Sequence, residues 1–254
     1  MRNRAIWGLL AVLVLAEICY PLVSGETRAR IVVATVVLGY VASVAHAALM
    51  QGKRVAAALV AVTAGGGFAV EALGVATGVP FGEYAYGDAL GAKLLDVPIV
   101  IPLAWTWMAW PAWLASGRLA VPYAARVTIA GLGLAAWDLF LDPQMVDQGY
   151  WRWTRPEPAL PDVPGIPLSN YLGWLVVAIA LMALLGALGG RAAREPGGDA
   201  PMLALYLWTY ASSVLAHAVF LDLPASAVWG GLAMGAVAVP LAVRLAARRA
   251  PVLT

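Results

Sequence analysis

Charged residues and cysteine are scarce in this sequence. Only 12% of its 254 residues are Asp, Glu, Lys or Arg, while 62% are hydrophobic. This excludes a soluble globular domain and is typical of a polytopic membrane protein. One cysteine, Cys19, excludes a disulfide framework and a cysteine-based metal site. Two histidines are too few for a convincing metal cluster, and a formal charge of +2 without a basic stripe gives no indication of nucleic-acid binding.

Long apolar runs are abundant instead. Eight of them approach the roughly 20 residues that a membrane-spanning helix needs. They cover approximately residues 6–23, 31–50, 55–77, 97–116, 122–142, 170–189, 201–221 and 225–243. The first run resembles a signal peptide, but Glu17 and the lack of a small-residue cleavage site favour a retained helix. The sequence therefore predicts an all-α bundle of about eight transmembrane helices, forming one transmembrane domain over residues 1–254.

Basic residues predict the orientation of this bundle. With a cytoplasmic N-terminus, the inner segments would hold eleven of the 16 Lys and Arg residues and the outer segments five. Segments rich in basic residues alternate with segments poor in them along the whole chain. We therefore expect both termini to be cytoplasmic and the protein to be a multi-pass protein of the cell membrane, surrounded by lipid.

Two connections on the predicted outer side are long. Residues 78–96 are rich in glycine, and residues 143–169 carry Pro156, Pro158, Pro161, Pro164 and Pro167. Proline at that density argues against a regular helix or a central strand. The tyrosine and tryptophans of residues 143–169 suggest a lid. Residues 189–201 are expected to be a plain linker, and the lack of an internal repeat argues against a two-fold transporter architecture.

Two carboxylates lie at the end of the fifth apolar run. Asp138 and Asp142 are four positions apart, which on a helix places them on one face with Cβ atoms about 5–6 Å apart. Pro143 predicts that the helix ends at Asp142, next to the negative end of its dipole. Low dielectric, a like-charged neighbour and the dipole together favour the protonated form of at least one of the pair.

Other polar residues share the outer half of the predicted membrane. Buried acids usually face a bundle interior or a water-filled cavity. We therefore expect one polar chamber that gathers most of these residues, while His46 lies near the inner face. Its candidate members are Glu17, Glu71, Asp96, Asp138, Asp142, Asn170, His217 and Asp222.

Ordinary structural interpretations compete with this one. Asp96 and Asp222 are close enough to helix ends to be interfacial residues, and His217 suits a packing or hydrogen-bonding role. Trp105, Trp107, Trp110 and Trp113 are first interpreted as an interfacial belt with lipid-facing packing. For Glu71, Asp138 and Asp142 the functional interpretation is favoured, because two acids one helical turn apart at membrane depth are hard to explain as scaffolding.

The same residues carry a family resemblance. Five blocks taken in order resemble the CruF-type carotenoid hydratases, the bisanhydrobacterioruberin hydratase or carotenoid-biosynthesis family. The blocks are Glu71 with residues 77–86 (TGVPFGEYAY), residues 97–105 (VPIVIPLAW), residues 138–143 (DLFLDP), residues 149–153 (GYWRW) and residues 165–174 (GIPLSNYLGW). Residues 154–163 depart from the family pattern.

The resemblance implies water addition to the terminal double bond of an acyclic carotenoid, giving a tertiary alcohol. Such a reaction needs a protonated acid, an aromatic wall for the carbocation and a base to orient water. It needs no cofactor and no metal. We expect Asp138 or Asp142 to be the acid, Glu71 to share its proton network and Asn170 to hold water. The candidates for substrate contact are Trp137, Tyr84, Tyr86, Trp151, Trp153, Trp105 and His217.

Rival functions stay open at this point. An intramembrane prenyltransferase would use the aspartates for a magnesium diphosphate, but the sequence has one such motif and few nearby cations. A proton-coupled transporter could relay protons through Glu71, Asp138 and His217. A retinal photoreceptor is excluded, because Lys53 and Lys93 both fall in predicted loops. The sequence does not indicate an oligomeric state.

Overall fold

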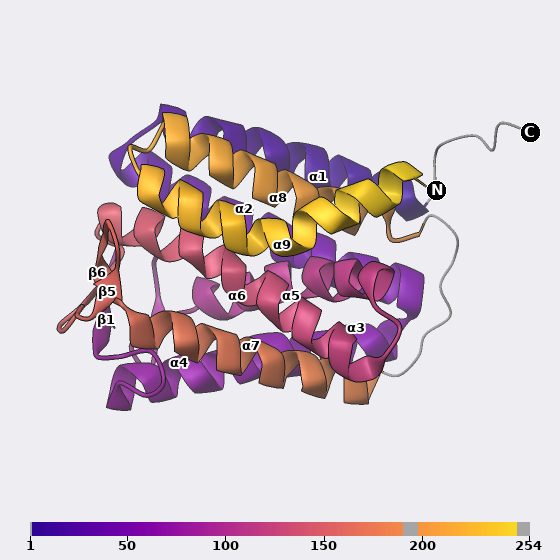
Figure 1. Ribbon diagram of the computed structural model, residues 1–254, viewed down its shortest axis with the longest axis horizontal. Coiled ribbons are helices and arrows are strands. Elements are labelled where there is room, and N and C mark those ends of the chain that lie inside the picture. The colour runs from indigo at the N-terminus through magenta and orange to yellow at the C-terminus, as the bar shows by residue number, and fades with distance from the viewer. Residues whose placement is uncertain (1, 190–197, 248–254) are drawn as a thin grey trace, which may run out of the picture.

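The computed structural model describes residues 2–189 and 198–247. In these residues the chain forms a bundle of eight helical rods, one of which contains a π-helical turn (Figure 1). The rods are α1 (Arg2–Cys19, extended by the 3₁₀ turn η1, Tyr20–Leu22), α2 (Gly25–Gln51), α3 (Lys53–Leu59) continued through the π turn η2 (Val60–Gly65) into α4 (Gly66–Thr77), α5 (Val100–Leu119), α6 (Tyr123–Asp147), α7 (Leu168–Gly189), α8 (Ala200–Val219) and α9 (Pro224–Ala247).

Each predicted apolar run coincides with one of these rods. Among the described residues, seven rods are long and apolar enough to cross a membrane. The eighth, α5, has 20 residues and spans about 30 Å at 1.5 Å per residue. The prediction of a polytopic helical membrane protein is confirmed. The fourth run was placed slightly early, because Val97 and Pro98 belong to a short strand and the helix begins at Val100.

The helix α5 lies at the centre of the bundle, between α2, α6, α8 and α9 (Figure 1). Its tryptophans, expected to face lipid, are buried: at most 7% of Trp105, Trp107, Trp110 or Trp113 is exposed. That expectation was wrong because other helices surround α5, and two of the four indole N–H groups find acceptors inside the bundle. Trp110 donates to His46 Nδ1 over 3.0 Å, and Trp105 donates to Glu71.

The first described residues of α1 and the end of α9 lie at the same end of the bundle, opposite the β-strands (Figure 1). An even number of crossings produces this arrangement, as the basic-residue pattern requires. His46 Nε2 donates to Gly198 O over 3.0 Å, close to that end. Most of the predicted 189–201 linker, with Arg191 and Arg194, lies outside the described residues, as do Arg248 and Arg249.

The two long connections contain short strands, none of which is a central strand. They form three antiparallel two-stranded ribbons: β1 (Tyr84–Tyr86) with β4 (Trp151–Trp153), β2 (Lys93–Leu94) with β3 (Val97–Pro98), and β5 (Ala159–Leu160) with β6 (Val163–Pro167). A strand in such a ribbon has one free edge, where proline costs no hydrogen bond. The prolines Pro164 and Pro167 are therefore compatible with β6.

The helix α6 also differs from expectation at its end. It passes through Pro143 and continues to Asp147. A proline removes one N–H bond, but the turn is completed by Gln148 N–H to Gln144 O and by Tyr150 N–H to Met145 O. The helix ends just before Gly149, whose φ of +69° is the left-handed conformation typical of a glycine that follows a helix C-terminus. Asp142 therefore lies inside the helix, and the dipole argument does not apply to it.

The helices α2 and α5 approach each other closely at Gly39, and this contact can be tested by its effect on stability. A Cβ added at Gly39 would lie 2.5 Å from the Trp107 Cδ1 and Cδ2 atoms. We expect Gly39→Ala to force the indole aside and to lower the free energy of unfolding by about 1–3 kcal/mol, measured as a lower melting temperature in detergent. Gly8→Ala is the matched control, because its Cβ would meet nothing within 4 Å. Equal melting temperatures for the two variants would refute this account of the packing.

Candidate active site

The carboxyl group of Glu71, on α4, is enclosed by three donors. Tyr84 and Tyr86 donate their hydroxyls to Oε2 over 2.6 and 2.8 Å, and Trp105 Nε1 donates to Oε1 over 3.0 Å. Only 3% of Glu71 is exposed. A buried carboxyl group needs such partners, since leaving it without them costs several kcal/mol. The donors come from α5 and β1, so two segments distant from α4 in the chain fix this side chain.

The β1–β4 ribbon brings the aromatic residues of both long connections together. Its register pairs Tyr84 with Trp153 and Tyr86 with Trp151. Alternate residues of a strand point to the same side, so all four rings face the helices. The ring centroids of each pair lie 5.6 and 5.5 Å apart. Burial and the adjacent Glu71 carboxyl group raise the pKa of Tyr84 and of Tyr86, and both phenols therefore remain donors at neutral pH.

A second acidic group stands across from Glu71. Asn170, near the start of α7, donates its Nδ2 group to Asp138 Oδ2 over 2.9 Å and also to Asp142 Oδ2. Trp151 Nε1 donates to Asp142 Oδ1 over 3.0 Å. The predicted shared face of Asp138 and Asp142 is thus confirmed, and both are buried. Two carboxyl groups joined by one amide donor can hold a proton as a coupled pair.

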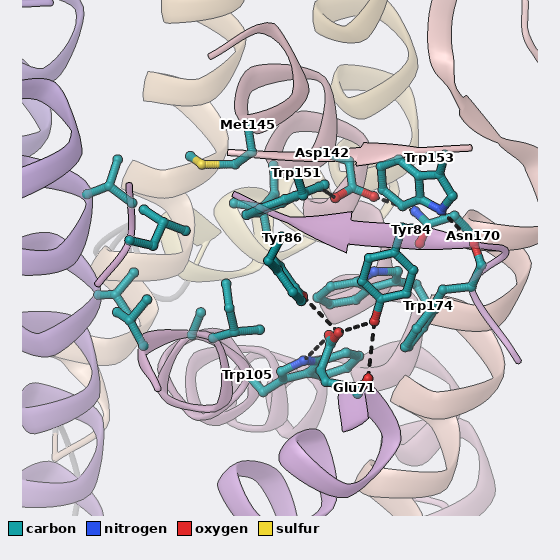
Figure 2. Close-up of a pocket in the computed structure, with 18 residues that line it drawn as sticks. Glu71, Tyr84, Tyr86, Trp105, Asp142, Met145, Trp151, Trp153, Asn170 and Trp174 are labelled. Atoms are coloured by element: carbon teal, nitrogen blue, oxygen red, sulfur yellow. Dashed lines mark hydrogen bonds between the residues drawn. The ribbon is translucent and has the colours of Figure 1, made fainter. Parts of the chain in front are cut away.

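A small cavity separates the two acidic groups (Figure 2). Its volume is about 40 Å³, and its walls include Glu71, Asp142 and Asn170 together with Tyr and Trp rings. That volume exceeds the roughly 10–15 Å³ that one water requires, and polar partners surround it. In the described part of the chain, none of the ion pairs includes Glu71, Asp138 or Asp142. The site therefore combines acids, hydrogen-bond donors and aromatic faces without a paired cation.

The structure brings together most of the predicted site residues. Those at this cavity or bonded to its acids are Glu71, Tyr84, Tyr86, Trp105, Asp138, Asp142, Trp151, Trp153 and Asn170.

Other predicted members lie elsewhere. Trp137 packs edge-on against Trp107 and lines a different cavity. His217 bonds to Ser226 Oγ over 2.5 Å and to Gln144 Oε1 over 3.2 Å, which fits its packing interpretation. The single polar chamber was therefore too broad an expectation.

The remaining acids of that chamber are also separate. Glu17 accepts a hydrogen bond from Trp208 Nε1 over 2.5 Å and lines the same cavity as Trp137. Asp96 and Asp222 have positive φ values of +62° and +55° and lie in connections between elements.

Two aromatic residues of the site were missed as site members. Trp174 stacks on Trp105 with centroids 3.9 Å apart and an interplanar angle of 8°. Phe81 lies between Tyr84 and Trp174, with centroids 6.2 and 6.3 Å away. A signal existed for Trp174, because it follows Asn170 by four positions and so shares its helical face.

A metal centre has no obvious place among the described residues. Outside the gaps at residues 190–197 and 248–254, no group of three His, Cys, Asp or Glu side chains is arranged to hold a metal ion. The oxygens of Asp142 already accept bonds from Trp151 and Asn170.

The fold and site define a polytopic helical membrane protein with an internal acid–aromatic centre. Comparison with known families is more specific. The chain belongs to the carotenoid biosynthesis protein family, whose model matches residues 31–237. That match includes every residue of the acid–aromatic centre.

One curated relative is the bisanhydrobacterioruberin hydratase of Haloarcula japonica. It is 37% identical over 129 residues, which cover 49% of this chain and 42% of the relative. The match thus spans less than half the length of that protein. No solved structure gives a significant match.

The Glu71 network can be tested directly. Tyr86→Phe removes one of three donors to a buried carboxyl group, and we expect it to lower the free energy of unfolding by about 1–3 kcal/mol. The measurement is the melting temperature in detergent. Tyr40→Phe removes the same hydroxyl atom from a residue of α2 outside the site and should change stability less. A larger loss in Tyr40→Phe would contradict the assigned hydrogen bonds.

Proposed function

We propose that this protein is a carotenoid hydratase that adds water to the terminal double bond of an acyclic carotenoid end group. The observation that carries the proposal is the buried Asp138–Asn170–Asp142 group, which faces Glu71 across a water-sized cavity with aromatic walls. Membership of the carotenoid biosynthesis family and the name of the Haloarcula relative support it independently. The family relation suggests the substrate class, and the site supplies the chemistry.

The reaction proceeds in two steps. A carboxylic acid O–H transfers its proton to the less substituted carbon of the terminal trisubstituted alkene, and the π electrons form the new C–H bond. This leaves a tertiary carbocation and a carboxylate. Water then adds through its oxygen to the cation and loses one proton, which returns to the carboxylate directly or through a neighbouring group. The net change is addition of one water, and the acid is regenerated.

Asp142 is the proton donor in this scheme. It lines the cavity, whereas Asp138 lies behind it and reaches the same amide of Asn170. The two carboxyl groups share the proton as a coupled pair. When Asp142 gives its proton to the alkene, Asp138 therefore helps to accommodate the negative charge that is left. Asn170 holds the pair in position through its Nδ2 group, and it also lines the cavity in which it was expected to hold water.

Glu71 and the aromatic rings complete the scheme. Glu71 lies on the far wall of the cavity and accepts three hydrogen bonds, which suits it to orient the attacking water. Tyr86 and Trp151 lie between it and Asp142, and their ring faces can stabilise a carbocation by cation–π attraction. The proposed setting is the cell membrane, with the polyene entering laterally from lipid.

The acid assignment makes a sharp prediction. In a host that makes an acyclic carotenoid, the wild-type protein should yield pigment heavier by the mass of one water per hydrated end. Asp142→Asn and Asp138→Asn should each lower this yield at least about 100-fold, because each removes a carboxyl group from the proton-sharing pair. The measurement is mass analysis of extracted pigments, normalised to the folded protein in the membrane.

Asp222→Asn is the matched control. It makes the same chemical change, and asparagine tolerates the positive φ of that position. We expect it to retain activity. Full hydration by both Asp138→Asn and Asp142→Asn would defeat the assignment, and unaltered pigment with wild-type protein would defeat the proposed function.

A further inference from the structure

The cavity between the acids is too small to hold an isoprenoid chain. At about 40 Å³ it has room for water, whereas pockets for organic ligands usually measure about 300–1,000 Å³. The substrate chain must therefore occupy another space that adjoins this one. The described residues line two larger cavities, and these differ in their relation to the acids.

The first larger cavity adjoins the acid cavity. Its volume is about 430 Å³, and it lies between α1, α2, α6 and α8. Four aliphatic side chains line both spaces, namely Val32, Val36, Leu141 and Met145. Leu141 and Met145 flank Asp142 along α6. Met145 is unbranched and adaptable, so this shared wall can rearrange to admit an apolar chain end.

The walls of this cavity suit a conjugated hydrocarbon. Trp107, Trp137 and Phe140 contribute aromatic faces from α5 and α6, and aliphatic residues of α1 and α2 line the cavity beside them. The lining is mainly apolar, and its polar members are Glu17, Thr35, Gln144, Thr209, Ser212 and Ser213. A polyene buried there would exchange lipid for well-packed aromatic surface. The location also explains why Trp137 lies apart from the acids although it directly precedes Asp138.

The second larger cavity is the rival. It measures about 690 Å³ and lies between α6, α7 and α9. It is lined by Ala135, Leu139 and Tyr171, but by none of the residues that line the acid cavity. A chain held there would have no shared wall through which its end could reach Glu71 and Asp142.

Resting on the proposed function, we propose that the cavity between α1, α2, α6 and α8 is the binding site for the polyene chain. The chain lies against Trp107 and Trp137, and its end group crosses the wall of Val32, Val36, Leu141 and Met145 to reach Asp142. Water and polyene thus approach the reacting carbon from different cavities. The acid cavity supplies the water, and the larger cavity supplies the alkene.

Thiol protection tests this site without relying on turnover. In full-length Cys19→Ser protein in lipid nanodiscs, Ala216→Cys places a thiol on the wall of the proposed cavity and Ala233→Cys places one on the wall of its rival. Both alanines are half-buried and lie on neighbouring helices. The probe is an acyclic polyene, and the readout is the rate of labelling by an apolar maleimide.

We expect the polyene to slow labelling of Ala216→Cys about tenfold at a concentration about ten times its Kd, and to leave labelling of Ala233→Cys unchanged. Protection of Ala233→Cys alone, or of neither thiol, would overturn the proposal. Protection of both to the same extent would also overturn it, because it would indicate non-specific partition into the bilayer.

Activity separates this inference from the proposed function. Ala216→Trp should reduce hydrated pigment at least about tenfold by filling the chain site, while Ala233→Trp should retain it; the melting temperature of each variant checks folding. Should Ala216→Trp fail to fold, Ala216→Leu provides a smaller obstruction with a smaller expected loss. Hydration by wild type with full activity in Ala216→Trp would refute the cavity alone. Absence of hydration by wild type, with protection of Ala216→Cys intact, would refute the proposed function alone.

Discussion

Ionisable groups inside a membrane protein need hydrogen-bond partners, and this requirement organises the end of the bundle that carries the β-strands. Glu71 has no cation beside it among the described residues and depends instead on Tyr84, Tyr86 and Trp105. Asp142 depends in the same way on Trp151 and Asn170. Most of these donors belong to the connections and to the central helix. The short β1–β4 ribbon is therefore part of the centre, because it carries hydroxyl and indole donors to acids on α4 and α6.

Neutral donors have a chemical consequence. An arginine or lysine beside these acids would hold them ionised, whereas O–H and N–H groups satisfy the oxygens without adding charge. A proton can then be shared within the Asp138–Asp142 pair, next to rings that can stabilise a cation. The two cavities complement this arrangement, since a space of about 40 Å³ between the acids adjoins a larger one of about 430 Å³ with a mainly apolar lining. In the proposed scheme, the difference in size between the two cavities separates the water from the polyene.

Much of the architecture could be predicted from hydrophobic run length. A backbone that crosses lipid must satisfy its own hydrogen bonds, so each apolar run of sufficient length becomes a helix. The spacing of Asp138 and Asp142 likewise placed both on one face, because helical periodicity is local. Prediction from local sequence failed where tertiary packing overrode a local preference. Pro143 did not end α6, and the tryptophans of α5 are buried because other helices surround α5.

The sequence by itself determined the number of helices, the common end of the first and last of them, and the pairing of the two aspartates. These follow from periodicity and from the cost of placing charge in lipid. Only the tertiary structure decided which acids meet. The π turn at Val60–Gly65 adds a residue that rotates the following helix by about 100°, and so sets the face on which Glu71 lies. The register of β1 with β4, from segments 65 or more residues apart in the chain, then supplies its partners. Long-range contacts of this kind leave no periodic signal in the sequence.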